Sequence, residues 1–247
     1  MNTTITNKGL IIGSAIIGCA LLASVFVGAY SLVKIRTFSN TISVTGSAEK
    51  LITSDVVKWT SGFSRNVDID GVAYGYVLIH KDITTTIEYL KAQGITEKEL
   101  TIKPVIMNQN YEPTEKYGSK MVGYTLQQII EIQSNNVPMI TKLAQDAPAK
   151  LSESGILFST HGLEYFYSKF ADLKVEMLAD ATKNAKARAE KIAESTGANI
   201  DLLQSASMGV FQVTPQNSVD VSDYGYFDTS SIEKKVTSVV RASFSLK

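Results

Sequence analysis

Residues 181–197 read ATKNAKARAEKIAESTG, and this stretch determines the packing that we expect in the fold. Residues four apart lie on the same side of an α-helix, one turn above the other. Small side chains along that side let the helix backbone approach its neighbour closely. The pattern predicts a close helix–sheet contact, with a helix–helix seam between copies as the alternative. The small residues are Ala181, Ala185, Ala189 and Ala193, followed by Gly197.

On both sides of this helix, apolar and polar residues alternate in short runs, which is the pattern of half-buried strands. A polar stretch, 108–120, separates two of these runs and reads as a connection, and residues 50–54 join the first two strands. The predicted strands lie at residues 42–46, 57–64, 100–106, 122–132, 156–167, 200–213 and 236–246.

Two further helices are predicted, at residues 72–90 and 136–151, because apolar residues recur there every three or four positions. Asp70 is the expected N-cap of the first, and Gly94 stands where a helix usually ends. Pro148 lies inside the second and should kink or split it, since an interior proline costs about 3 kcal/mol.

The predicted order is ββαββαβαββ, an α+β fold with a mostly antiparallel sheet and helices packed on one face. Residues 56–167 within it follow the split βαβ pattern. No linker divides the region, so we expect one domain over 40–247. It is preceded by a tail at 1–8, a transmembrane helix at 9–33 and a linker at 34–39.

The segment from Gly9 to Val33 contains no charged residue. As a helix it would be roughly 37 Å long, enough to cross a hydrocarbon core of about 30 Å. A cleaved signal peptide would end at Val27-Gly28-Ala29, and a lipoprotein would use Cys19, which follows Ile16-Ile17-Gly18. We favour the third interpretation, an uncleaved signal anchor. The apolar run is longer than that of a usual signal peptide, and Ala20 to Ala29 stay hydrophobic where lipoproteins normally turn polar.

The flanking charges are nearly balanced, with Lys8 before the segment and Lys34 and Arg36 after it. The positive-inside rule therefore decides little. A large C-terminal domain can be translocated regardless of such charges, and on general grounds we expect the N-terminus inside.

Composition excludes several classes of function. Three of the 24 basic residues and none of the 24 acidic ones precede residue 40, so the domain has a small acidic excess and no nucleic-acid footprint. The only cysteine, Cys19, lies in the apolar segment, which leaves the domain without a disulfide, a thiolate nucleophile or a cysteine metal site.

No catalytic, cofactor-binding or metal-binding residue is predicted. The two histidines, His80 and His161, are isolated in the sequence, and none of the short catalytic or nucleotide-binding motifs occurs. We therefore expect the protein not to be an enzyme and to need no cofactor.

The loop 219–231 combines acidic and aromatic residues. It is a poor calcium loop, because Tyr224 stands where an EF-hand needs an oxygen ligand. A partner-binding tip and a hairpin end without function are the two remaining interpretations. Its acidic residues are Asp220, Asp223 and Asp228, and its aromatic residues are Tyr224, Tyr226 and Phe227.

Over about residues 40–247 the sequence resembles the bacterial SIMPL domain family. Pro148 and the tyrosine-rich loop 219–231 depart from the family pattern. The resemblance rests on the order and spacing of Ile42-x-Val44-x-Gly46-x-Ala48, Asp55, Leu90-Lys91 with Gly94-Ile95, Gly123-Tyr124 ahead of a glutamine-containing strand, Gly155-Ile156 and the four-spaced alanines ending at Gly197.

The resemblance implies an exported or membrane-anchored domain, with links to envelope stress and a tendency to self-assemble. It supplies no catalytic residues. We therefore expect a non-enzymatic envelope domain in the bacterial inner membrane, single-pass, with its C-terminal domain in the periplasm. Its partners would be the membrane, through 9–33, a second copy of the chain, or another envelope protein. The alternative is a small-molecule-binding or enzymatic domain whose site has no short motif, which a large pocket with perturbed carboxylates would favour.

Overall fold

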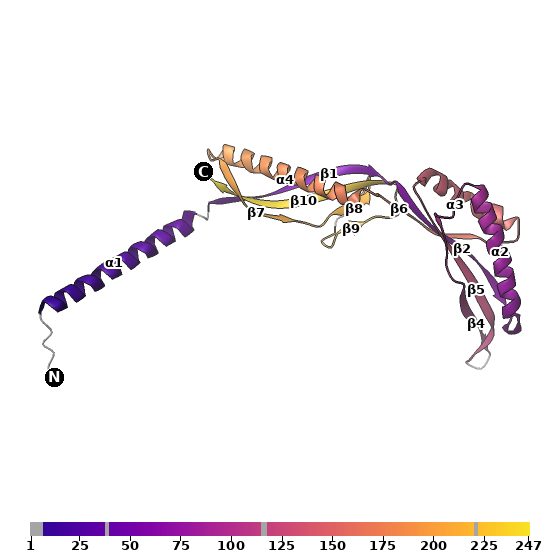
Figure 1. Cartoon of the computed structure of the whole chain (residues 1–247). Coiled ribbons are helices and arrows are strands. Elements are labelled where there is room, and N and C mark those ends of the chain that lie inside the picture. Colours follow the sequence, from indigo (N-terminus) through magenta and orange to yellow (C-terminus); the bar gives the residue numbers. More distant parts are fainter. Residues whose placement is uncertain (1–6, 38–39, 115–117, 220–221) are drawn as a thin grey trace, which may run out of the picture. The chain divides into compact units, whose positions relative to one another are not determined.

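The computed structural model describes residues 7–37, 40–114, 118–219 and 222–247, and opens with one long helix, α1 (Asn7–Thr37; Figure 1). Its stretch Ile11–Leu32 is the one described helix long and apolar enough to cross a membrane, and none of it is buried against the protein. The predicted apolar helix is therefore confirmed. The helix also includes residues 34–37 of the predicted linker 34–39. Residues 38–39 of that linker and residues 1–6 of the predicted tail lie outside the described residues.

The chain packs as two compact units, each built from distant parts of the sequence. The first unit comprises Met1–Ala48, Leu178–Gly209 and Ser238–Lys247, and the second comprises Glu49–Met177 and Val210–Thr237. The predicted single domain contains residues of both. Three elements contribute to both units, and they are β1 (Thr41–Thr53), α4 (Phe170–Ser195) and β10 (Glu233–Leu246).

In the first unit, β10 is the central strand, with β1 on one side and β7 (Ile200–Met208) on the other. The β7 pairing is antiparallel and places Ala206 opposite Ala242. Helix α4 lies along this sheet (Figure 1). The buried core between them contains Val44, Ala185, Ala189, Ala242 and Phe244.

The alanine row on α4 is the inner face of that contact. All four alanines are at most 1% exposed. The first two of them lie against Gly46 on β1, where an added Cβ would overlap the carbonyl oxygen of Ala181 and the backbone nitrogen of Ala185. Helix and strand backbones thus touch directly, which confirms the predicted close helix–sheet contact.

In the second unit, a five-stranded sheet has the order β3-β5-β2-β6, and β4 also pairs with β5. Two helices, α2 (Val72–Ala92) and α3 (Val137–Ser152), cover one face and bury Trp59 and Ile130 (Figure 1). The strands are β2 (Val56–Val67), β3 (Leu100–Ile102), β4 (Ile106–Thr114), β5 (Gly118–Ser134) and β6 (Ser159–Phe166). Two short strands complete the unit: β8 (Gln212–Pro215) pairs with the start of β10, and β9 (Tyr226–Phe227) runs parallel to β8.

The α+β fold class is confirmed: the described residues form four helices and ten strands, nearly all antiparallel. The expected single sheet is instead two sheets, because β1 and β2, which only Ser54 and Asp55 separate, enter different ones. The polar stretch 108–120, predicted as a connection, belongs largely to β4 and the start of β5. Both faces of β4 are solvated, so its sequence lacks the apolar alternation that reveals a strand.

Some predicted helix ends are right and one is wrong. Gly94 and Gly155 end helices at positive φ (94° and 74°), as expected. Asp70 is not an N-cap. It lies inside a short 3₁₀ turn, Ile69–Gly71, and α2 begins after Gly71 with no side-chain cap.

Pro148 does not split α3, which continues through it to Ser152. The proline removes the N–H that would bond the Ala144 carbonyl. That carbonyl accepts a hydrogen bond from the Thr160 hydroxyl at 3.0 Å instead, and Thr160 in turn accepts one from Trp59 Nε1 at 3.1 Å. A side chain from β6 therefore replaces the missing backbone donor, which the sequence of the helix alone does not reveal.

Candidate functional site

The two histidines lie on different elements of the second unit, and no described contact joins them. His80 is exposed on α2. His161 is exposed on β6, and its Nε2 lies 3.1 Å from the hydroxyl of Ser159. Residues two apart on a strand share a face, which explains the contact. A nucleophilic pair also needs a third group that orients the base, and no described residue bonds the other ring nitrogen of His161.

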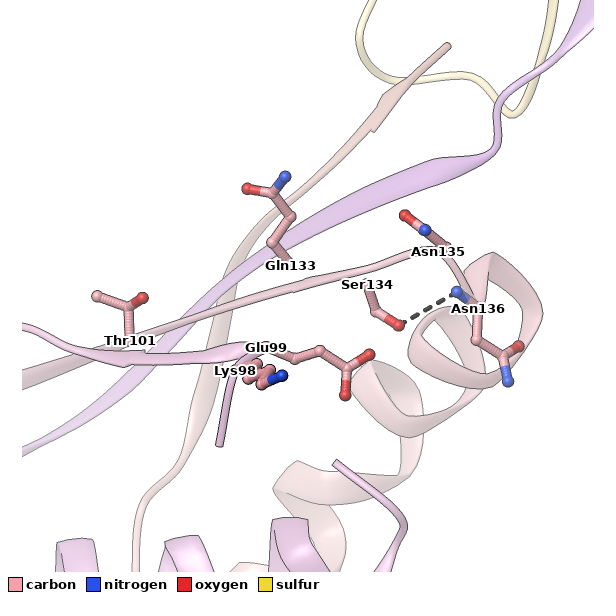
Figure 2. Close-up of a pocket in the computed structure, with 7 residues that line it drawn as sticks. All are labelled: Lys98, Glu99, Thr101, Gln133, Ser134, Asn135 and Asn136. Carbon is pink, nitrogen blue, oxygen red and sulfur yellow. Dashed lines mark hydrogen bonds between the residues drawn. The ribbon is translucent and has the colours of Figure 1, made fainter. Parts of the chain in front are cut away.

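An open polar groove of about 760 Å³ lies in the second unit, at the end of β5 and the start of β3 (Figure 2). Small-molecule sites are usually enclosed and mostly apolar, with a few convergent polar groups. This groove has no apolar floor. Its lining residues are Lys98, Glu99, Thr101, Gln133, Ser134, Asn135 and Asn136.

Glu99 is the carboxylate of this groove, and its neighbours hold it in the ionised form. Figure 2 shows its side chain directed at Ser134 near the start of α3. Hydrogen bonds from the Ser134 hydroxyl and from the N–H and hydroxyl of Thr96 lower the pKa of Glu99. A general acid at neutral pH needs the opposite shift. Glu99 therefore fastens the turn before β3 to the end of β5, and a proton-transfer role does not follow from its surroundings.

A second carboxylate, Asp82 on α2, is buried and has a structural partner. Its two oxygens accept hydrogen bonds from Arg65 Nε and Nη2, at 2.6 and 3.0 Å. Arg65 Nη2 also donates to the carbonyl of Gly155 at 3.1 Å. This bidentate pair joins β2, α2 and the turn after α3, and bidentate arginine pairs are among the strongest of such contacts.

In the loop 219–231, the two acidic residues that the structure describes do not converge. Asp223 is exposed, Asp220 lies outside the described residues, and Asp228 is buried. The Asp228 carboxylate lies 3.2 Å from Lys234 Nζ, whose side chain is 2% exposed. Burial acts to raise the pKa of Asp228, but hydrogen bonds from Ser230, Ser231 and Lys234 outweigh it and hold that pKa well below its usual range. Asp228 therefore holds the end of the loop 219–231 to Lys234 on β10.

The aromatic residues of this loop divide into anchored and free ones. Phe227 packs edge-to-face on Phe170, with ring centroids 5.4 Å apart, and Phe170 packs in the same way on Phe211. Tyr224 is 96% exposed. A firmly held base with one free tyrosine suits the predicted partner-binding tip, which stays a prediction.

The sheet of the first unit has two outer strands, β1 and β7, and they differ in how their outer edges are covered. The edge of β1 is bonded by α4: Asn184 accepts from Ser47 N–H at 3.2 Å, and Arg188 donates to the Thr45 carbonyl at 3.1 Å. Strand β7 pairs only with β10 among the described strands. Its residues are exposed along almost its whole length.

A comparison with known families identifies the family of the chain. A family model described as SIMPL, a protein of unknown function (DUF541), matches residues 42–244, which covers both units apart from the apolar helix. No curated protein matches the chain. The match brings no catalytic or binding residue with it, so the surfaces above are known only from their geometry.

Proposed function

The chain belongs to the SIMPL family, and we propose that it is a non-enzymatic, membrane-anchored envelope protein that acts by binding other protein chains. In this proposal α1 remains attached to the mature protein in the bacterial inner membrane. The two units lie in the periplasm and present surfaces to a second copy or to another envelope protein. The implied link to envelope stress stays a prediction from the family.

One observation carries the proposal. The stretch Ile11–Leu32 is a helix of 22 residues, and no part of it is buried by the rest of the chain. At about 1.5 Å per residue it is roughly 33 Å long, which matches the hydrocarbon core. Apolar side chains along a whole helix need a nonpolar environment, and a bilayer supplies it without any partner protein.

The non-enzymatic part of the proposal is supported by how the ionisable groups are used. Asp82, Asp228 and Glu99 each accept several hydrogen bonds from the protein, so each is committed to holding two segments together. The Ser159–His161 contact is exposed and lacks an orienting group. These features fit a scaffold that presents surfaces.

The test uses the full chain expressed in a bacterium. We expect it to stay in the membrane fraction after alkaline carbonate washing, and protease added to spheroplasts to digest both units. Recovery in the soluble fraction, or protection of the units until lysis, would contradict the anchor or its orientation. Crosslinking in cells, detergent extraction and affinity purification then identify the bound chains. If no crosslinked species forms at native expression, the binding role is wrong.

A further inference from the structure

The first unit protects one edge of its sheet and leaves the other open. An unprotected edge is a template for another strand, and proteins usually block it with charges, proline, bulges or a covering element. On β1, α4 supplies the block, because Asn184 and Arg188 bond the outward-pointing groups of Ser47 and Thr45. These two side chains are one helical turn apart, like the alanines that bring α4 onto the sheet.

The outer edge of β7 has no such cover. The N–H of Gly209 donates to the Val239 carbonyl of β10 at 2.9 Å. Because backbone groups alternate in direction along a strand, those of Ala206 and Met208 point away from β10. No hydrogen bond links them to any other part of the described chain. Register shifts disturb the first half of β7, whereas residues 205–208 pair regularly with β10 and form a continuous edge.

The composition of β7 suits pairing with itself. No charged residue occurs between Leu202 and Val210. The only charge on the strand, Asp201, lies at its start, 2.9 Å from Lys247. Like charges directly opposite each other destabilise a strand pair, so a strand that meets its own copy must be nearly neutral. Leu203 and Met208 are half exposed and supply apolar surface.

We propose that β7 is a strand-addition site at which a second copy of this chain pairs its own β7, antiparallel, about a two-fold axis near Ala206. The proposal rests on the binding role given above and names its surface and its partner. A pairing of β7 with the β1 edge of another copy is disfavoured, because Asn184 and Arg188 occupy that edge. A closed two-fold contact uses the same patch twice, so it yields a dimer and ends there.

The nearly cysteine-free sequence permits a direct test with the full chain in its membrane. In a Cys19→Ala background, Ala206→Cys should form an intermolecular disulfide under mild oxidation. Two residues that exchange hydrogen bonds across an antiparallel pair have Cα atoms about 5.5 Å apart, and a disulfide spans about 4.4–6.8 Å. The matched control is Asn108→Cys on β4, which is also exposed and should stay monomeric. Equal crosslinking of both, or none at position 206, would overturn the proposal.

A charge exchange then tests the two-fold axis. Ala206→Lys alone and Ala206→Glu alone should each weaken the dimer roughly two- to fivefold, because each variant faces its own charge. An equal mixture of the two should regain at least the unsubstituted affinity. A head-to-tail contact would lack this rescue, and that outcome would refute the self-pairing. Failure of membrane retention would contradict the proposed function while leaving both readouts interpretable.

Discussion

Substituting Gly46 by alanine should destabilise the first unit strongly, although it adds one methyl group. The new Cβ would overlap the Ala181 carbonyl oxygen and the Ala185 nitrogen, and it would lie 2.7 Å from the Ala185 Cβ. Two of these three atoms belong to the helix backbone, so no side-chain rotation relieves the clash. The helix must move away from β1, and the buried alanine row loses its contact.

The expected magnitude follows from two opposing contributions. Overpacking a tight core costs about 1–3 kcal/mol, and a clash with backbone belongs at the upper end of that range. Alanine recovers about 0.4–1 kcal/mol by restricting the unfolded chain. The net loss is roughly 2 kcal/mol, which for about 200 residues lowers the melting temperature by about 4–8 °C.

The assay is thermal and urea unfolding of the full chain in detergent, followed by circular dichroism. The matched control is Gly162→Ala on β6, where an added Cβ meets nothing within 4 Å. That variant should stay within about 0.5 kcal/mol of the natural chain, as surface changes usually do. If Gly46→Ala is as stable as Gly162→Ala, α4 does not lie on β1 at van der Waals distance, and the account of the alanine row is wrong.

Four further outcomes are expected. Ala189→Leu should destabilise the chain by about 1–3 kcal/mol without changing its assembly size, whereas Lys186→Leu on the exposed face of α4 should have little effect. Intact-mass measurement should show residues 9–33 still attached, and a start at Tyr30 or a lipid on Cys19 would contradict the anchor. His80→Ala and His161→Ala should leave any phenotype of the folded protein near that of the natural chain, and a loss with expression intact would reveal a site. Asp228→Asn should cost about 3–5 kcal/mol at neutral pH, because Lys234 stays buried without its carboxylate. The folded pKa of Asp228 lies below its unfolded value of about 3.9, so the natural chain loses this advantage as the pH falls through and below that value. The difference in urea unfolding between the two chains should therefore shrink at about pH 3, and a difference independent of pH would show that the ion pair is not its origin.

The elements that the sequence predicted best are those with one buried face. The long strand β5 and the helix α4 bury residues at a regular period, so apolar residues recur at that period in their sequences. The strand β4 is solvated on both faces and showed no period. The division of the strands between two sheets was missed for a different reason. Pairing is decided by partners distant in sequence, and the two residues that separate β1 from β2 look like an ordinary turn.

The polar contacts were even harder to predict from the sequence. Asp228 was grouped with Asp220 and Asp223 by proximity, whereas the structure gives it Lys234, a basic residue inside a strand at 2% exposure. Such a lysine is informative in retrospect, because lysine is rarely buried without a partner. Thr160, which bonds the carbonyl left free by Pro148, carries no comparable signal, since threonine is common in strands.

The alanine row links the packing of the first unit to its surface. Ala181, Ala185 and Ala189 advance by about 40° round the helix at each step, so the buried stripe winds with the twist of the sheet. Asn184 and Arg188 have the same spacing on the flank of that stripe, and the rotation of α4 that buries the alanines also delivers both side chains to the edge of β1. The other helix in the described part of this unit, α1, is not buried against the chain over Ile11–Leu32, so α4 is the helix that packs on this sheet. One helix on the three strands that this unit contributes to the five-stranded sheet can block only one of their two edges, and the spacing of residues on α4 decides that the open one is β7.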